Sequence, residues 1–214
     1  SLKHEYSYHF KWLGRPIIQY PQDIVATQEL IWQVKPDLII ETGIARGGSL
    51  IFSASILELI GKGHVLGIDI DIRSHNQNAI KKHPMSKRIK MIQGSSIDTQ
   101  VLNKVNSIAK SKKQIMVFLD SNHTYDHVLK ELELYSKFVK KDSYLIVFDT
   151  IIEEISNKWW GTFLPTRPWN KQNNPKQAVR DFLSKNKRFV IDHSIEDKLL
   201  LTVAPSGYLK CIKN

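Results

Sequence analysis

The sequence has few of the features that mark extracellular, membrane-spanning or disordered proteins. A single cysteine, Cys211, excludes an internal disulfide framework and fits a reducing cytosol; we interpret it as a packing or surface residue. No apolar run reaches the roughly 18 residues of a membrane span, and the first twenty residues lack the apolar core of a signal peptide. With 42% apolar residues in a chain of 214, we expect one folded, cytoplasmic domain.

Acidic residues are scarce relative to basic ones, and the formal net charge is +10. An acidic partner could explain this excess: a phosphorylated or lipid-linked substrate, a membrane surface or nucleic acid. However, the basic residues form short groups where helices should end, and there they offset the helix dipole. We therefore favour a lysine-rich surface. No nucleic-acid-binding motif is present, so nucleic acid is not an expected partner, while peripheral membrane contact stays open.

Strand-like and helix-like patterns alternate from residue 37 to residue 149, which predicts βαβ units around a parallel sheet. The expected strands are Leu38–Glu41, His64–Asp69, Arg88–Gln93, Ile115–Asp120 and Tyr144–Phe148. The expected helices are Asp23–Gln33, Ser49–Ile60, Tyr125–Val139 and Pro175–Leu183. Two closing strands, Arg188–Asp192 and Lys198–Ala204, are expected to form a hairpin.

Two segments lie outside this alternation. Residues 1–36 are aromatic, and we expect them to form an N-terminal cap segment on a domain of residues 37–214, or to support a contact in a homo-oligomer. The loop from Trp159 to Pro175 is long and holds three tryptophans. Loops of this length in compact domains are commonly functional, so we expect its aromatic part, Trp159 to Trp169, to close over a substrate.

A glycine turn follows the first expected strand. It begins after Glu41 and contains Gly43, Gly47 and Gly48, and the next strand ends at Asp69. Such a turn lets the backbone approach a nucleoside ligand, and the second acid can accept hydrogen bonds from ribose hydroxyls. The glycine spacing is not G-x-G-x-x-G and no Walker lysine follows, so the pattern favours S-adenosylmethionine over a dinucleotide.

Acidic and hydroxyl side chains follow the remaining strands. Ser95 and Ser96 come after the third strand and suit the adenine edge of a cofactor, as does Asp98, which could instead cap the next helix. Asp120 ends the fourth strand and Asp149 follows the fifth. The carboxyl ends of parallel strands share one edge of a sheet, where open α/β sheets bind their ligands. We therefore expect all of these side chains near one site.

Asp120 and Asp149 are the candidates for chemistry. We expect their strands to flank the first strand, which would bring two carboxylates together and favour a Mg²⁺ ion between them. Such an ion lowers the pKa of a bound hydroxyl; alternatively, either acid could act as a base without metal. His123 could take the hydroxyl proton or simply bond to a loop backbone. His127 falls within an expected helix and is interpreted as structural.

Taken together, these motifs resemble the cephalosporin-hydroxylase family, whose members are S-adenosylmethionine-dependent methyltransferases. The resemblance rests on the stretches Gly14–Pro21, Pro36–Ser49, Gly67–Asp71, Gly94–Ser96, Leu119–His123, Glu131–Tyr135, Asn173–Pro175 and Leu199–Tyr208. It implies a Rossmann-like class I methyltransferase fold: a seven-stranded, mostly parallel sheet with an antiparallel last strand and helices on both faces.

The resemblance also implies a Mg²⁺ site formed by Asp120 and an acid pair after the fifth strand. Here that pair is Phe148-Asp149, so one oxygen ligand is missing. Thr150, His123 or water could replace it; the alternative is a vestigial site. The family usually has a glycine-rich turn before Asn173, whereas this chain has Trp169-Asn-Lys-Gln172 there.

We therefore expect an O-methyltransferase acting on a hydroxyl of a small or glycosidic metabolite. The expected cofactor-binding residues are Glu41, Gly43, Gly47, Gly48, Ser49, Asp69, Ser95, Ser96 and Asp120. The expected catalytic residues are Asp120, His123 and Asp149, and the expected metal ligands are Asp120 and Asp149. Two alternatives remain: a cofactor-binding protein without turnover, which Phe148 favours, and a non-heme iron hydroxylase, which needs a second histidine ligand.

Overall fold

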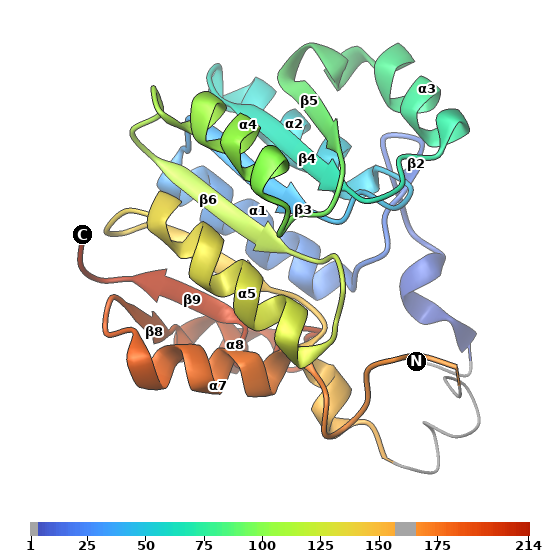
Figure 1. Cartoon of the computed structure of the whole chain (residues 1–214). Helices are drawn as coiled ribbons and strands as arrows, with labels where there is room; N and C mark the ends of the chain where they lie inside the picture. Colours follow the sequence, from blue (N-terminus) through green and yellow to red (C-terminus); the bar gives the residue numbers. More distant parts are fainter. Residues whose placement is uncertain (1–3, 157–165) are drawn as a thin grey trace.

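The computed structural model describes residues 4–156 and 166–214. In this part of the chain, a central sheet lies between two layers of helices (Figure 1). The sheet has seven strands in the order β5-β4-β3-β6-β7-β9-β8. They are β3 (Leu38–Thr42), β4 (His64–Asp69), β5 (Ile89–Gln93), β6 (Ile115–Leu119), β7 (Tyr144–Val147), β8 (Phe189–Ile191) and β9 (Tyr208–Cys211).

The pairing of the strands confirms the expected fold class. Strands β3 to β7 run parallel to one another, and β9 pairs antiparallel with both β7 and β8. Every residue of β3, β6 and β7 is buried, as expected for parallel strands covered by helices on both faces. The five strands expected between residues 37 and 149 all form, with ends within one residue of those predicted.

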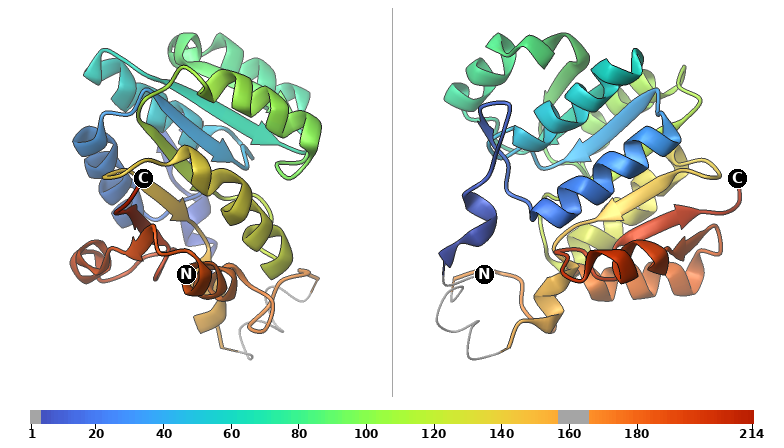
Figure 2. Two further views of the ribbon diagram at one scale, coloured as in Figure 1. Left: turned by 60° about the vertical axis from the view of Figure 1, so that its left-hand side comes forward. Right: turned by 180° about the vertical axis from the view of Figure 1, so that it is seen from behind.

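The helices divide between the two faces of the sheet, as Figure 2 shows from two further directions. One core contains residues of α1 (Pro21–Val34), α2 (Gly48–Ile60), α3 (Ser74–Lys82) and α8 (His193–Leu199). The opposite core contains residues of α4 (Thr99–Ala109), α5 (Tyr125–Tyr135) and α7 (Pro175–Lys185). Short 3₁₀ helices complete the description: η2 (Tyr6–Tyr8), η3 (Pro84–Arg88), η4 (Ser136–Phe138) and η5 (Thr150–Glu154).

The N-terminal segment, which precedes the first strand of the sheet in sequence, packs onto the domain. Strands β1 (Lys11–Trp12) and β2 (Arg15–Pro16) form a small hairpin. Trp12 anchors it to α2: its indole N–H donates to Ser55 Oγ at 3.0 Å, and its ring meets Phe52 edge to face. Helix α1 follows and buries Ala26, Leu30 and Ile31 in the core.

The C-terminal strand prediction was wrong. Residues 198–204 belong to the end of α8 and the loop after it, and the last strand is β9. The loop is held by Asp23 of α1, whose carboxylate accepts hydrogen bonds from the Val203 N–H at 2.9 Å and the Tyr208 hydroxyl at 2.6 Å. Apolar sequence alone does not distinguish such a loop from a strand. Strand β8 pairs with β9 instead of with residues 198–204, and Cys211 of β9 is buried.

The helix prediction for residues 125–139 was also too long. Helix α5 ends at Tyr135, and the apolar pattern continues through η4. Among the helices of the described ranges, none combines the length and apolar character needed to cross a membrane.

Candidate active site

Three strand ends form the floor of the site. Asp120 directly follows β6, the glycine turn follows β3, and Asp149 lies two residues beyond β7. One expectation was wrong: β6 is adjacent to β3, but β7 lies on the far side of β6 and does not flank β3. The two aspartates still approach one another, because β6 and β7 are adjacent parallel strands that end at the same edge.

The glycines of the turn are required by contacts within the protein. Gly43 has φ +91°, and a Cβ there would lie 1.9 Å from the carbonyl oxygen of Asp120. A Cβ on Gly48 would lie 2.2 Å from the carbonyl oxygen of Pro16 and 2.6 Å from Ile17 Cα. The turn therefore packs directly against β6 on one side and the N-terminal segment on the other.

The main cleft has a volume of about 1210 Å³ and opens above these strand ends. Its walls come from the N-terminal segment, the glycine turn, the loops after β6 and β7, and residues 166–169. Seven of the predicted site residues line it: Gly43, Gly47, Gly48, Ser49, Asp120, His123 and Asp149. The lining also includes Tyr6, Tyr8 and Trp169, whose rings suit a ligand with an apolar face.

Asp69 lies behind the glycine turn and is absent from the lining of this cleft. Its Oδ2 accepts hydrogen bonds from the backbone N–H groups of Ile44 at 2.8 Å and Ala45 at 3.2 Å, and Oδ1 accepts from the Asp71 N–H at 3.0 Å. In this conformation Asp69 shapes the turn. Whether it also accepts from ribose hydroxyls stays a prediction.

Ser95 and Ser96 follow β5 and likewise lie outside the main cleft. The Ser96 hydroxyl is 3.1 Å from His127 Nε2, and its carbonyl oxygen accepts from the Tyr135 hydroxyl at 2.7 Å. The same His127 nitrogen is 3.3 Å from Ser121 Oγ, so His127 links the loop after β5 to the loop after β6. This agrees with a structural role for His127. Asp98 caps α4 by accepting from two backbone N–H groups, as one of its two interpretations predicted.

Glu41 is buried at the end of β3. Its exposure is 2%, Ser49 Oγ donates to its Oε1, and Oε2 has no hydrogen-bond partner in the described structure. Burial raises the pKa of this carboxyl to about 7, and the bond from Ser49 opposes that shift only in part. Glu41 does not line the main cleft. It borders a small cavity of about 20 Å³ beneath it, enough for one or two water molecules.

Asp120, His123 and Asp149 form the chemical centre of the cleft. One ligand atom from each side chain lies within 4.8 Å of the others, and His123 Nε2 is 3.2 Å from Asp149 Oδ2. Asp149 has φ +56°, a left-handed conformation that aspartate tolerates better than most residues. This arrangement of carboxylates and an imidazole can bind a divalent cation or accept a proton.

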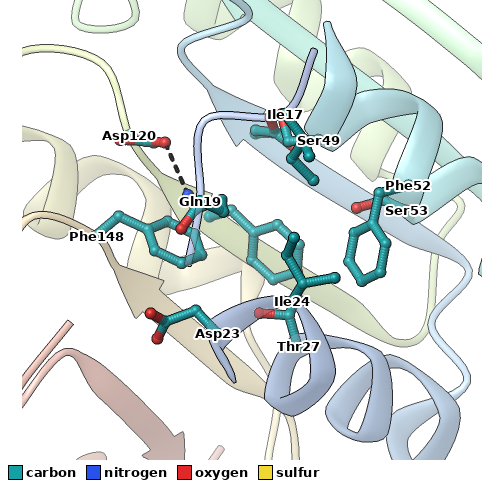
Figure 3. Close-up of a pocket in the computed structure, with 12 residues that line it drawn as sticks. Ile17, Gln19, Asp23, Ile24, Thr27, Ser49, Phe52, Ser53, Asp120 and Phe148 are labelled. Carbon is teal, nitrogen blue, oxygen red and sulfur yellow. Dashed lines mark hydrogen bonds between the residues drawn. The ribbon is translucent and has the colours of Figure 1, made fainter. Parts of the chain in front are cut away.

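The electrostatics of Asp120 reflect this crowding. Burial raises the pKa of its carboxyl well above the usual range, and the negative charges of Asp149, Glu41 and Glu131 act in the same direction. Gln19 opposes the shift: its side-chain N–H donates to Asp120 Oδ2 at 3.3 Å (Figure 3). A cation between Asp120 and Asp149 would relieve the repulsion.

Phe148 stands at the position before Asp149, where the sequence resemblance led us to expect a second acid. Phe148 is buried and meets Phe118 edge to face, with ring centroids 6.2 Å apart. Thr150, one of the proposed replacements, donates its hydroxyl hydrogen to the Pro205 carbonyl oxygen at 2.7 Å. His123, the other protein candidate, is the side chain that lies beside Asp149.

The expected aromatic lid lies partly outside the described residues, because residues 157–165 are not described. Its last residue, Trp169, meets the His123 ring edge to face with centroids 4.7 Å apart, and the Arg167 guanidinium lies over the Trp169 ring. Sequence reasoning did not single out Gln19, Arg167 or this particular contact of Trp169. The motif containing Gln19 was noted, but nothing in it indicated a bond to a residue a hundred positions away.

Comparisons with known proteins gave matches in sequence and in structure. The profile of the family described as Rhamnosyl O-methyltransferase/CmcI matches residues 4–212. A Rhamnosyl O-methyltransferase of Mycobacterium tuberculosis is 29% identical over 127 residues, which is 58% of this chain and 50% of that protein. The Rhamnosyl O-methyltransferase of Mycobacterium leprae is 26% identical over 140 residues, 65% of this chain and 59% of that protein. The chain thus spans about half the length of the curated relatives it matches.

Solved structures share the fold. An apo structure of CmcI superposes with a TM-score of 0.64 and 17% identity, covering 97% of this chain and 78% of that one. CmcI with Mg and SAM gives a TM-score of 0.61 at 17% identity, over 96% and 77% of the two chains. MycE, from the mycinamycin biosynthetic pathway, in complex with Mg, SAH and mycinamycin VI, gives 0.55 at 17% identity, over 99% and 52%.

Proposed function

Because the chain belongs to the Rhamnosyl O-methyltransferase/CmcI family of class I S-adenosylmethionine-dependent methyltransferases, we propose that it transfers a methyl group from S-adenosylmethionine to a hydroxyl of a small or glycosidic acceptor. The observation that carries this proposal is the convergence of three features on one cleft. The glycine turn, the Asp120–His123–Asp149 group and the aromatic side chains of Tyr6 and Trp169 all face it.

The cofactor would lie against the glycine turn. Gly43, Gly47, Gly48 and Ser49 line the cleft there, with Asp120 at its end, where the methyl group would be presented. The other proposed cofactor-binding residues are Glu41, Asp69, Ser95 and Ser96, which support the surrounding loops from behind. Asp69 holds the turn by accepting a hydrogen bond from the Ile44 N–H, and Glu41 accepts one from the Ser49 hydroxyl.

A Mg²⁺ ion would be held by Asp120 and Asp149. Hard oxygen ligands suit this ion, which needs only one or two protein carboxylates because it keeps several waters. The donors fit, since two carboxylate oxygens lie within 4.8 Å of each other and of His123. When bound, such an ion lowers the pKa of a coordinated hydroxyl. Phe148 supplies no oxygen, so we expect weaker Mg²⁺ binding than two adjacent acids would give.

Methyl transfer itself needs alignment more than covalent help from the protein. An oxygen lone pair of the acceptor forms the new O–CH₃ bond as the C–S bond of the sulfonium breaks, and S-adenosylhomocysteine leaves. The hydroxyl proton passes to His123. His123 Nε2 lies 3.2 Å from Asp149 Oδ2, so the imidazolium formed by this transfer would be next to a carboxylate. The Asp149 carboxylate would therefore stabilise the charge that His123 acquires.

The acceptor class is proposed from the relatives and the cleft lining. Tyr6, Tyr8 and Trp169 offer aromatic faces on which the apolar side of a sugar ring can stack. Residues 4–20 supply much of this wall, which supports a capping role for residues 1–36. The rhamnosyl acceptors named for the mycobacterial relatives make a rhamnosyl glycoside the first class to test.

Two measurements test the proposal. Calorimetric titration with S-adenosylmethionine should show binding at micromolar concentrations. A screen of methyl-labelled cofactor against rhamnosides, other glycosides and simple phenols should show transfer to a sugar hydroxyl. Asp120→Asn should bind the cofactor but transfer no label, because the variant keeps the shape and loses the carboxylate. Absence of cofactor binding by the wild-type protein would contradict the proposal.

A cofactor-binding protein without turnover is the second candidate, and the observation that favours it is Phe148 at the position of a family acid. Cofactor binding without label transfer to any acceptor class would support it. The iron hydroxylase alternative finds less support, because the acid–imidazole group assembled by the described residues contains one histidine.

A further inference from the structure

Gln19 lies at the boundary between the main cleft and the small cavity that Glu41 borders. It is in the segment between β2 and α1, and it lines both the main cleft and the small cavity beneath it. Ser49 and Asp120 are the other two residues that border both. Figure 3 shows Gln19 in the centre of the cavity wall, with its amide directed at Asp120. A residue of the N-terminal segment, Gln19, therefore contacts and supports Asp120, a proposed metal ligand.

The contact between Gln19 and Asp120 is directional. The side-chain N–H of Gln19 donates to Asp120 Oδ2 at 3.3 Å, and Gln19 is 7% exposed. A cation beside Asp120 would keep its carboxylate ionised, and an ionised carboxylate can only accept hydrogen bonds, so the amide then has to present its NH₂ group to it. Its oxygen, Oε1, is then buried without a hydrogen-bond partner in the described residues. Because an orphaned buried oxygen lowers stability, the amide is not explained by stability alone.

The segment that carries Gln19 is fixed to the glycine turn. The guanidinium of Arg15 donates to the Arg46 carbonyl oxygen, through Nε at 3.2 Å and also through Nη2. The first residue of α2, Gly48, leaves room for the backbone of residues 16 and 17 to lie directly against it. The segment that holds Gln19 therefore packs directly on the glycine turn.

We propose that Gln19 is a positioning residue for Asp120. It fixes the rotation of the carboxylate so that the other oxygen, Oδ1, is presented to the divalent cation and the acceptor hydroxyl in the main cleft. This inference rests on the proposed function, because it assumes that Asp120 is a metal ligand.

The test uses Mn²⁺ as the probe, with the free ion counted by electron paramagnetic resonance in protein saturated with S-adenosylhomocysteine. Gln19→Leu should weaken Mn²⁺ binding about tenfold or more, as expected when a residue that orients a metal ligand is lost. The affinity for S-adenosylhomocysteine should change less than about threefold, and the melting temperature should not fall, because the orphaned oxygen is removed. Gln19→Met provides a second apolar variant should the leucine variant fail to fold.

Gln22→Leu is the matched control. Gln22 lies in the first turn of α1, its side-chain oxygen is also buried without a partner in the described structure, and no hydrogen bond described here joins it to Asp120. The Mn²⁺ affinity of the Gln22→Leu variant should equal that of the wild-type protein. Equal losses in the two variants would overturn the assignment to Gln19.

The outcomes separate this inference from the proposed function. Wild-type affinity for Mn²⁺ in Gln19→Leu would overturn the positioning role and leave the proposed function standing. Cofactor binding by the wild-type protein without Mn²⁺ binding would instead contradict the metal site of the proposed function, and the positioning role with it.

Discussion

Replacing Glu41 with glutamine is expected to change how the free energy of unfolding depends on pH. In the folded protein burial raises the pKa of this carboxyl to about 7, whereas the ordinary value is 4.5. Between these two pH values the folded protein keeps a proton that the unfolded chain has released. Stability contributed by this group therefore falls as the pH rises from about 4.5, and the loss is complete above about pH 7.

The magnitude follows from the two pKa values. A rise from 4.5 to about 7 corresponds to roughly 3 kcal/mol of unfolding free energy lost across this window. Glutamine has the same shape and does not titrate. Its NH₂ group would occupy the buried position where Oε2 of Glu41 has no hydrogen-bond partner in the described structure, at a cost of about 1–3 kcal/mol that does not vary with pH.

Urea unfolding between about pH 4.5 and 8 measures the difference. The stability of Glu41→Gln relative to the wild-type protein should increase by roughly 3 kcal/mol across this range, whatever the constant offset between them. Ser49→Ala is the control: it removes the hydrogen bond to Glu41 but keeps the carboxyl, so the pH dependence should persist. Parallel pH profiles for the wild-type protein and Glu41→Gln would refute the reasoning.

Three further predictions follow from the strand ends. Asp69→Ala removes the acceptor that holds two backbone N–H groups of the turn, so we expect S-adenosylhomocysteine to bind about tenfold or more weakly by calorimetry; unchanged affinity would exclude a role for Asp69. Gly43→Ala should lower stability by more than about 2 kcal/mol, because its Cβ would meet the Asp120 backbone, whereas Gly61→Ala, with a similar φ and open space, should cost less; equal losses would argue against the clash. Phe148→Glu should strengthen Mg²⁺ binding about tenfold or more in calorimetry, at some cost in melting temperature, and unaltered affinity would place the metal elsewhere.

The parallel part of the fold could be predicted because its strands are short, buried apolar runs separated by clear turns. Val65 to Ile68 and Ile115 to Leu119 are examples, and each forms a strand in the expected place. The same criterion failed for residues 198–204, where an apolar run belongs to a helix end and a loop. Leu200 is 92% exposed there, and the loop is fixed by Asp23, about 180 positions earlier.

The candidate site also has a part that the sequence predicts and a part that it does not. Asp120, His123 and Asp149 were predictable because strand ends in parallel sheets meet at one edge. Gln19 was not, because its contact with Asp120 spans 101 positions and depends on how the N-terminal segment folds over the cleft. The order of strands was also not fully predictable, and β7 lies beyond β6 instead of beside β3.

The close contacts of the glycine turn affect how its sequence motif should be used to recognise related proteins. Gly43 is confined by the backbone of Asp120, and Gly48 by the backbone of Pro16 and Ile17, through contacts within the protein itself. Selection for folding alone would therefore preserve this spacing in a descendant that had stopped transferring methyl groups. In a search for active members, the glycine spacing identifies ancestry, and the proposed function predicts that the side chains at positions 120, 123 and 149 discriminate.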